Sequence, residues 1–110
     1  MRQDIEIVNL TPHPINMSDG TVYPPSGIVA RVIETQVGCV AAANVYVFGG
    51  IDGLPEPKKG VYYIVSKPTA MLADGRFDVF FPDNIIRNES GTVIGCGCFG
   101  RYATDESEFE

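Results

Sequence analysis

Hydrophobic and polar residues alternate with a period of two along much of the chain, which is the pattern of half-buried β-strands. The first such segment is DIEIVNL (4–10), where acidic and aliphatic residues alternate. Asp19-Gly20, flanked by short β-prone pieces, is a strong hairpin signal. Further strands are expected in GIVARVIETQVGCVAA (27–42), VYVFGG (45–50), VYYIVS (61–66) and RFDVFFP (76–82), and two more in NIIRNESGTVIGCGCFGRY (84–102), around a turn at 89–91.

Glycine and proline indicate where these strands bend or end. Gly38 predicts a bulge in the strand that contains it, and Pro82 is expected to stop the strand before it. LPEPKKG (54–60) is typical of a loop. One segment, PTAMLAD (68–74), is typical of a short helix, with Ser66 as a candidate cap.

About seven short strands and one short helix predict an α+β fold that is predominantly antiparallel β. No strand–helix–strand spacing suggests a parallel sheet. The 110 residues, of which 45% are hydrophobic, suit one small domain over 1–104, followed by an acidic tail at 105–110. Because so small a domain has a modest core, association with further copies would add buried apolar surface.

The net charge of −6 argues against nonspecific binding to duplex DNA, which depends on cationic contacts to phosphate. A small phosphorylated ligand is compatible with this charge, since a few arginines suffice to hold it. An odd number of cysteines (Cys39, Cys96 and Cys98) and an acid-containing N-terminal stretch predict a reducing, cytosolic compartment. No apolar run approaches the roughly 18 residues that a membrane span needs.

The stretch VNLTPHPIN (8–16) contains His13, the one histidine of the chain, between two prolines. Asn9 and Thr11 favour turns, because their side chains bond to nearby backbone groups. A lone histidine in such a setting is more often a turn residue than a catalytic base, so a rigid turn is expected. The polar groups of Asn9, Thr11 and His13 can still line the mouth of a pocket.

No motif in the sequence assigns a catalytic residue or a metal site. There is no arrangement typical of a nucleophile with its base, and the glycine-rich stretches lack the ending of a phosphate loop. Cys96 and Cys98 form a C-x-C motif, which is a weak zinc signal when only Cys39 and His13 remain as further ligands. Buried, reduced thiols are the expected state of this pair.

Arginines and one phenylalanine are the candidates for ligand recognition. Arg31, Arg87 and Arg101 lie in or beside predicted strands of an acidic protein, which suggests either anion binding or salt bridges at strand edges. Phe77, Val79 and Phe81 share one face of their strand, so Phe80 is expected on the other face. There it is suited either to stacking on a base or to an oligomer contact.

Three stretches together, VNLTPHPIN to PPSGIVARV (8–32), LPEPKKGVYYIVS (54–66) and FPDNIIRNESGTVIGC (81–96), resemble a family of small phage proteins, the Thoeris anti-defence proteins of the first type. The resemblance implies a non-catalytic sponge that needs no cofactor. Such a protein holds cyclic ADP-ribose signals intact, and some members also bind cyclic oligonucleotides. It also implies dimers that assemble into hexamers, in the cytoplasm of a bacterial host.

The resemblance further implies roles for particular residues. Phe80 or Phe81 stacks on the adenine, Arg31 and Arg101 hold the pyrophosphate, and Asn88 or Asn84 contacts ribose hydroxyls. The remaining candidate ligand-binding residues are Arg87, Asn9, Thr11 and His13. The Gly- and Cys-rich CGCFGR stretch and the acidic tail depart from the family pattern.

Two other functions stay open at this point. One is a nucleotide-processing enzyme that uses His13 and an acid such as Asp83. The other is a structural phage protein that binds no small ligand.

Overall fold

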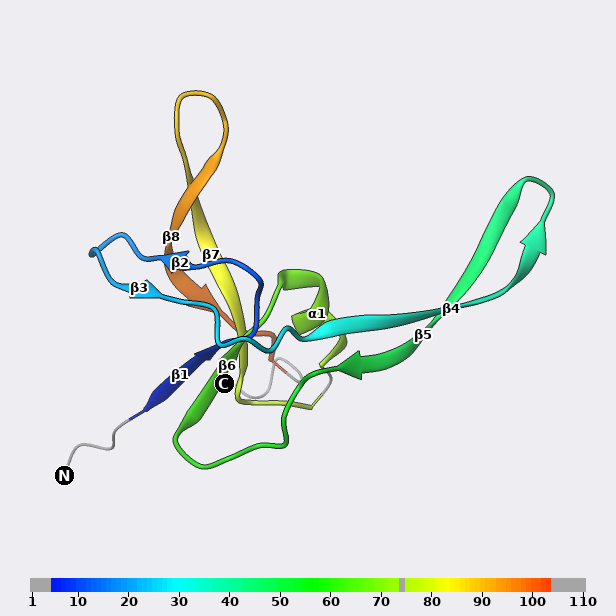
Figure 1. Cartoon of the computed structure of the whole chain (residues 1–110), viewed down its shortest axis with the longest axis horizontal. Coiled ribbons are helices and arrows are strands. Elements are labelled where there is room, and N and C mark those ends of the chain that lie inside the picture. The colour runs from blue at the N-terminus through cyan, green and yellow to red at the C-terminus, as the bar shows by residue number, and fades with distance from the viewer. Residues whose placement is uncertain (1–4, 74, 104–110) are drawn as a thin grey trace.

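The computed structural model describes residues 5–73 and 75–103, so the predicted acidic tail at 105–110 lies outside the described residues. The described chain is mostly β and forms a small body from which two hairpins project (Figure 1). Its elements are β1 (Glu6–Asn9), β2 (Ile15–Asn16), β3 (Val22–Tyr23), β4 (Arg31–Val40), β5 (Ala43–Asp52), β6 (Val61–Ile64), α1 (Lys67–Leu72), β7 (Val79–Arg87) and β8 (Val93–Gly100).

The body is built on a mixed four-stranded sheet with the order β1-β6-β7-β8. β6 pairs in parallel with both β1 and β7, whereas β7 and β8 are antiparallel. The expectation of a predominantly antiparallel sheet is therefore wrong for the body, and the described residues hold eight strands rather than about seven. The parallel β6–β7 pair arises because the segment 65–78, which contains α1, is long enough to carry the chain back to the same end of the sheet.

The core lies on both faces of β6, which confirms the strand expected in VYYIVS, although it ends at Ile64. On one face Val61, Tyr63 and Val65 pack with residues that include Leu10, Ala70 of α1, and Val79 and Phe81 of β7. On the other face Ile64 packs with Ile15 and Cys96, under the small β2–β3 hairpin. The alternation of side chains along β6 thus divides the core into two layers.

Most of the local predictions are confirmed. The hairpin at Asp19-Gly20 joins β2 and β3, and β4 shifts its register between Gln36 and Gly38, where a bulge was expected. Residues 54–58 form no strand or helix, and α1 begins directly after Ser66. Ser66 occupies the N-cap position without a side-chain capping bond, and its hydroxyl instead shares a hydrogen bond of 2.9 Å with that of Thr69.

The prediction that Pro82 ends its strand is wrong, because β7 continues through Pro82 to Arg87. β6 pairs with β7 only as far as Phe80, and Pro82 itself lies opposite Phe99 of β8. At Pro82 the strand therefore has a single hydrogen-bonded neighbour. Proline is tolerated at such an edge, since its missing N–H can face the unpaired side.

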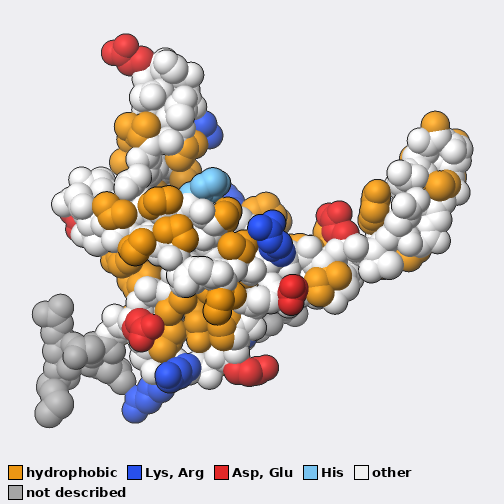
Figure 2. Space-filling view, viewed as in Figure 1, with side chains coloured by type: hydrophobic (Ala, Val, Ile, Leu, Met, Phe, Trp, Pro, Cys, Tyr) orange, Lys and Arg blue, Asp and Glu red, His pale blue; other side chains and the backbone are white. Residues whose placement is uncertain are grey.

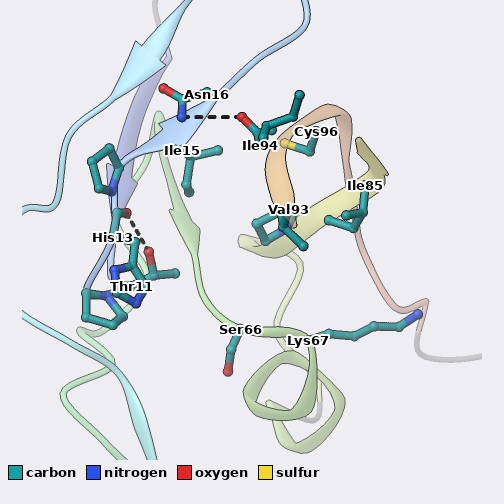
Figure 3. Close-up of a pocket in the computed structure, with 14 residues that line it drawn as sticks. Thr11, His13, Ile15, Asn16, Ser66, Lys67, Ile85, Val93, Ile94 and Cys96 are labelled. Atoms are coloured by element: carbon teal, nitrogen blue, oxygen red, sulfur yellow. Dashed lines mark hydrogen bonds between the residues drawn. The ribbon is translucent and has the colours of Figure 1, made fainter. Parts of the chain in front are cut away.

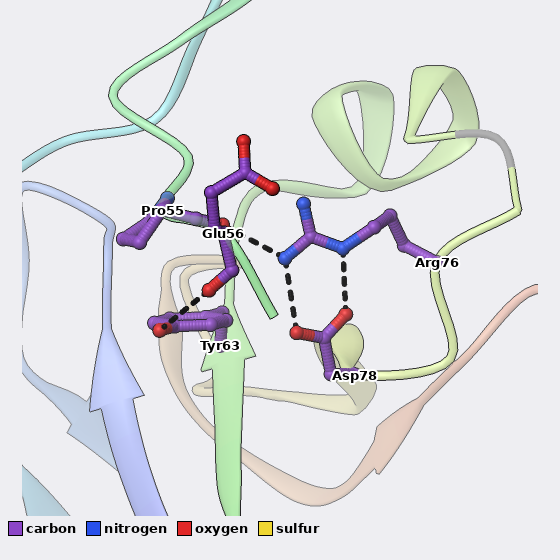
Figure 4. A network of polar contacts seen from close by, with 5 residues as sticks. All are labelled: Pro55, Glu56, Tyr63, Arg76 and Asp78. Atoms are coloured by element: carbon purple, nitrogen blue, oxygen red, sulfur yellow. Dashed lines mark hydrogen bonds and ion pairs between the residues drawn. The ribbon is translucent and has the colours of Figure 1, made fainter. Parts of the chain in front are cut away.

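Arg76 ties the 54–60 loop to the body (Figure 4). Its guanidinium makes a two-pronged contact with the Asp78 carboxylate, at 2.8 and 2.9 Å, and also donates to the Pro55 carbonyl at 2.9 Å. The hydrogen bond with Asp78 raises the pKa of Arg76, and both side chains are largely shielded from solvent. Within the described residues, no helix has the length and apolar character to cross a membrane.

Candidate functional site

A cleft of about 660 Å³ opens at the carboxyl ends of the parallel strands β1 and β6 (Figure 3). Because these strands run in the same direction, the segment after β1 and the segment after β6 meet at one edge of the sheet, which is a common position for ligand sites. The cleft is lined by Thr11, Pro12, His13, Pro14, Ile15, Asn16, Ser66, Lys67, Pro82, Ile85, Val93, Ile94, Gly95 and Cys96.

A second cleft of about 380 Å³ adjoins the first at the base of the β4–β5 hairpin. Thr11, Pro12 and Ser66 line both clefts, so the two share a wall. The second cleft adds Arg31, together with Leu10, Val29, Ala30, Val32, Pro68 and Thr69. The combined site is thus largely aliphatic on one side and has an arginine on the other.

The shared wall is held by the side chain of Asn9, which is only 2% exposed. Its amide nitrogen donates to the backbone carbonyls of His13 at 2.8 Å and Tyr23 at 2.9 Å. Its amide oxygen accepts from the Thr11 backbone N–H at 2.9 Å and from the Thr11 hydroxyl at 2.7 Å. VNLTPHPIN is therefore a rigid turn, as expected, and that turn forms the rim of the first cleft.

The charges around the two clefts are unevenly distributed. Neither set of lining residues contains an aspartate or a glutamate. In Figure 3 the side chain of Lys67 runs away from the cavity, and its Nζ lies 5.4 Å from the centroid of the Phe81 ring. Arg31 is thus the basic group best placed to hold an anion in the combined site, while the first cleft offers aliphatic surfaces and the imidazole of His13.

The structure brings together four of the predicted site residues. Thr11 and His13 line the first cleft, Thr11 and Arg31 line the second, and Asn9 supports the turn beneath them. Arg31 is the first residue of β4, opposite Asp52, rather than the middle of a strand.

The two phenylalanines lie elsewhere in the body. Phe81 is a buried core residue, and its ring stacks on Tyr102 with 5.0 Å between centroids. Phe80 is half-buried on the opposite face of β7, as expected from the strand pattern. There its ring packs against that of Tyr62, with 4.8 Å between the ring centroids. Phe77, expected to share the buried face with Val79 and Phe81, precedes β7 and is exposed.

The other predicted site residues also lie away from both sets of lining residues. Asn84 donates to the Cys98 sulfur at 3.2 Å, and Arg87 donates to the Gly91 carbonyl at 2.9 Å. Asn88 accepts two backbone N–H bonds in the turn between β7 and β8. The Arg101 guanidinium lies 5.6 Å from the centroid of the Phe77 ring. A ligand-binding role for these residues stays a prediction, as does a role for Asp83, which lines neither cleft.

Several lining residues were not predicted from the sequence, notably Asn16, Ser66, Lys67, Ile85 and Ile94. A signal for two of them was present, because Ser66 and Lys67 follow a strongly hydrophobic strand and begin a helix. Polar residues at the carboxyl end of a buried strand are frequent ligand contacts. The aliphatic residues carry no such local signal, since only the tertiary fold brings them to the cleft.

Cys96 contributes a buried thiol to the wall of the first cleft, where it donates to the Met17 sulfur with 3.5 Å between the two sulfur atoms. Burial raises the pKa of this thiol, and Cys98, which is half-buried, raises it further. Cys96 therefore behaves as the small hydrophobic residue that the sequence predicted. Cys39, in contrast, is exposed.

We expect Cys96 to resist alkylation in the folded protein, because a thiol with a raised pKa and no solvent access supplies little thiolate. Iodoacetamide treatment at mildly alkaline pH, followed by mass spectrometry of peptides, should leave Cys96 unmodified. The same treatment in denaturant should modify Cys39, Cys96 and Cys98 alike. Rapid native labelling of Cys96 would contradict its placement in the core.

Comparisons of the chain with protein-family models, with curated protein sequences and with solved structures find no match.

Proposed function

We propose that this protein is a phage anti-defence sponge that sequesters a cyclic ADP-ribose-type signal without cleaving it. The proposal rests on the motif resemblance and on one structural observation. That observation is the pair of adjoining clefts, which share Thr11, Pro12 and Ser66 and contain no carboxylate among their lining residues.

The combined site suits a ligand with one planar, weakly polar part and one anionic part. Ile15, Ile85 and Ile94 offer aliphatic surface that can cover a purine ring, which every nucleotide of this class carries. Arg31 offers a planar fork that matches two phosphate oxygens. Neither lining contains a carboxylate that would repel a pyrophosphate, and the carboxylate paired opposite Arg31, that of Asp52, lies outside both linings.

Two other functions predict different outcomes. A nucleotide-processing enzyme needs a base within reach of an acid or a substrate proton. His13 lines the first cleft and Asp83 lines neither, so the geometry favours binding over this pairing. A structural phage protein would bind no nucleotide in either cleft.

The test is calorimetry against a panel of cyclic ADP-ribose isomers and cyclic dinucleotides. Bound ligand is then released by heat and identified by mass spectrometry. Recovery of intact ligand supports sequestration, and recovery of a cleaved product supports the enzyme. No heat with any member of the panel would count against both.

Replacing Arg31 with alanine should weaken binding of a cyclic ADP-ribose isomer by about 10- to 100-fold, because charge-assisted hydrogen bonds contribute roughly 1.5–3 kcal/mol. The dissociation constant from calorimetry measures this change. Lys59→Ala is the control, since Lys59 is an exposed basic residue that lines neither cleft and should leave binding unchanged.

One further substitution separates the clefts from other sites. Phe80→Ala should have little effect if the ligand lies in the clefts, because Phe80 lines neither of them. A large loss of binding with Phe80→Ala and none with Arg31→Ala would place the ligand at Phe80 and outside the two clefts.

A further inference from the structure

The hairpin of β4 and β5 extends far from the body (Figure 1). Every residue from 33 to 50 is exposed, and these residues are called the arm here. Val32 and Ile51, which pair with each other, are half-buried where the hairpin leaves the body. The radius of gyration is 16.3 Å, whereas a compact chain of this length has about 13 Å. The arm therefore stands clear of its own core.

The arm is apolar and uncharged to an unusual degree for an exposed segment. Its large hydrophobic side chains, each well exposed, are Ile33, Val37, Val40, Val45, Tyr46, Val47 and Phe48. From residue 35 to residue 51 the sequence contains no Asp, Glu, Lys, Arg, His or Pro. Figure 2 accordingly shows hydrophobic and uncharged groups over the outer part of the arm.

Such an arm is unlike a stable free element. A two-stranded hairpin without a packing partner is at best marginally stable in water. An exposed edge strand normally carries charges or proline, which prevent it from pairing with another chain. β4 has Glu34 and an extra residue between Gln36 and Gly38, whereas β5 has neither a charge nor an extra residue from Ala43 to Phe48. The β5 edge is thus open to strand pairing.

We propose that the arm is an interface between two copies of this chain, with the β5 edges paired antiparallel across a two-fold axis. Pairing of identical strands in this way places the same uncharged patch on both sides, as a two-fold interface requires. A partner with a charged surface would have charged groups buried and unpaired against this patch, whereas a second copy brings only uncharged groups to it. This assignment does not depend on the ligand proposed above.

The size of the arm suits a dimer. The eighteen exposed residues of the arm approach the roughly 20–30 residues per side that a standard interface uses. Both faces of β5 contribute apolar groups, with Val45 and Val47 on one face and Tyr46 and Phe48 on the other. Pairing at the edge also brings the side chains of neighbouring strands on each face into contact.

The first test is sedimentation analysis of the whole chain and of Val47→Lys at micromolar concentration. A lysine in the middle of β5 would put two ammonium groups close together in an uncharged interface, so the dimer should weaken by about 100-fold or more. The control is Val22→Lys, because Val22 also lies on a strand and is similarly exposed, at 52% against 48% for Val47. We expect a dimer or a larger assembly for wild type and Val22→Lys, and a monomer for Val47→Lys.

A second variant removes the arm, in case Val47→Lys fails to fold. Residues 33–50 are replaced by Asn-Gly, which closes a two-residue hairpin turn between the paired residues Val32 and Ile51. This variant should be a folded monomer by circular dichroism and sedimentation. A wild-type monomer, an armless variant that still dimerises, or an arm that captures only a different protein would each overturn the proposal.

Discussion

Replacing Asn9 with aspartate should lower the free energy of unfolding by about 3–4 kcal/mol at neutral pH. The substitution keeps the shape of the side chain and its acceptor toward Thr11, but it removes both N–H donors. The His13 and Tyr23 carbonyls would then face a carboxylate oxygen at 2.8 and 2.9 Å. Two acceptors would lose their partner while a buried charge is added, and both changes disfavour the folded state.

Urea unfolding followed by circular dichroism measures this loss, at one fixed protein concentration because association would add to the apparent stability. Asn16→Asp is the matched control, since Asn16 is exposed and its single bond to the Ile94 carbonyl is long, at 3.5 Å. It should change stability by no more than about 0.5 kcal/mol. Equal effects of the two substitutions would show that the Asn9 contacts are unimportant for the turn.

The local structure of this chain was largely predictable, because it depends on neighbouring residues. Period-two alternation located the strands, and Asp19-Gly20 located the β2–β3 hairpin. Asn9 and Thr11 identified the turn through their tendency to bond the nearby backbone. The bulge at Gly38 followed from the same kind of local reasoning.

The pairing of strands was not predictable in the same way. β1 and β6 lie side by side although a long stretch of chain separates them, and nothing in either segment specifies the other as its partner. β6 and β7 become parallel only because the short helix α1 and its flanking turns return the chain to the same end of the sheet. Pro82 was read as a strand end, because the sequence does not show that β7 has one neighbour there.

The exposure of the arm could not be predicted from its hydrophobic pattern. The hydrophobic residues of β4 and β5 resemble those of buried strands, yet no part of the described body covers them from 33 to 50. A sequence reports that a surface is apolar, but not whether its partner belongs to the same chain. The sequence predicts that further copies would add buried surface, and the arm is the surface where we propose that they do so. Association itself is still a prediction.

The candidate site was predictable only in part. Thr11, His13 and Arg31 were identified from their residue types and positions, and they do line the adjoining clefts. Ile85, Val93 and Ile94 come from the half of the β7–β8 hairpin next to its turn and reach the first cleft through the tertiary fold. Phe81 was a candidate for stacking as an aromatic residue, but its strand phase places it in the core.

The other large effect is expected at Gly53, which follows β5. Its φ of +83° is a conformation that residues with a Cβ adopt at a cost of about 1–2 kcal/mol. A Cβ at this position would also lie 2.5 Å from the Val29 carbonyl oxygen, which is backbone and cannot move aside easily. Gly53→Ala should therefore lower the free energy of unfolding by about 3–4 kcal/mol, since both penalties apply together.

Alanine substitutions at two other glycines measure each of these two penalties by itself. Gly50 has a positive φ of +109° with open space around it, so Gly50→Ala should cost only about 1–2 kcal/mol. Gly95 lacks a positive φ, but a Cβ there would lie 2.6 Å from the Asn16 carbonyl oxygen, so Gly95→Ala reports the close approach alone. If urea unfolding gives Gly53→Ala no larger loss than Gly50→Ala, then the contact with Val29 is relieved without cost. Because Val29 and Ala30 line the second cleft, the proposed function predicts that a Gly53 variant that still folds binds nucleotide less tightly than a Gly50 variant.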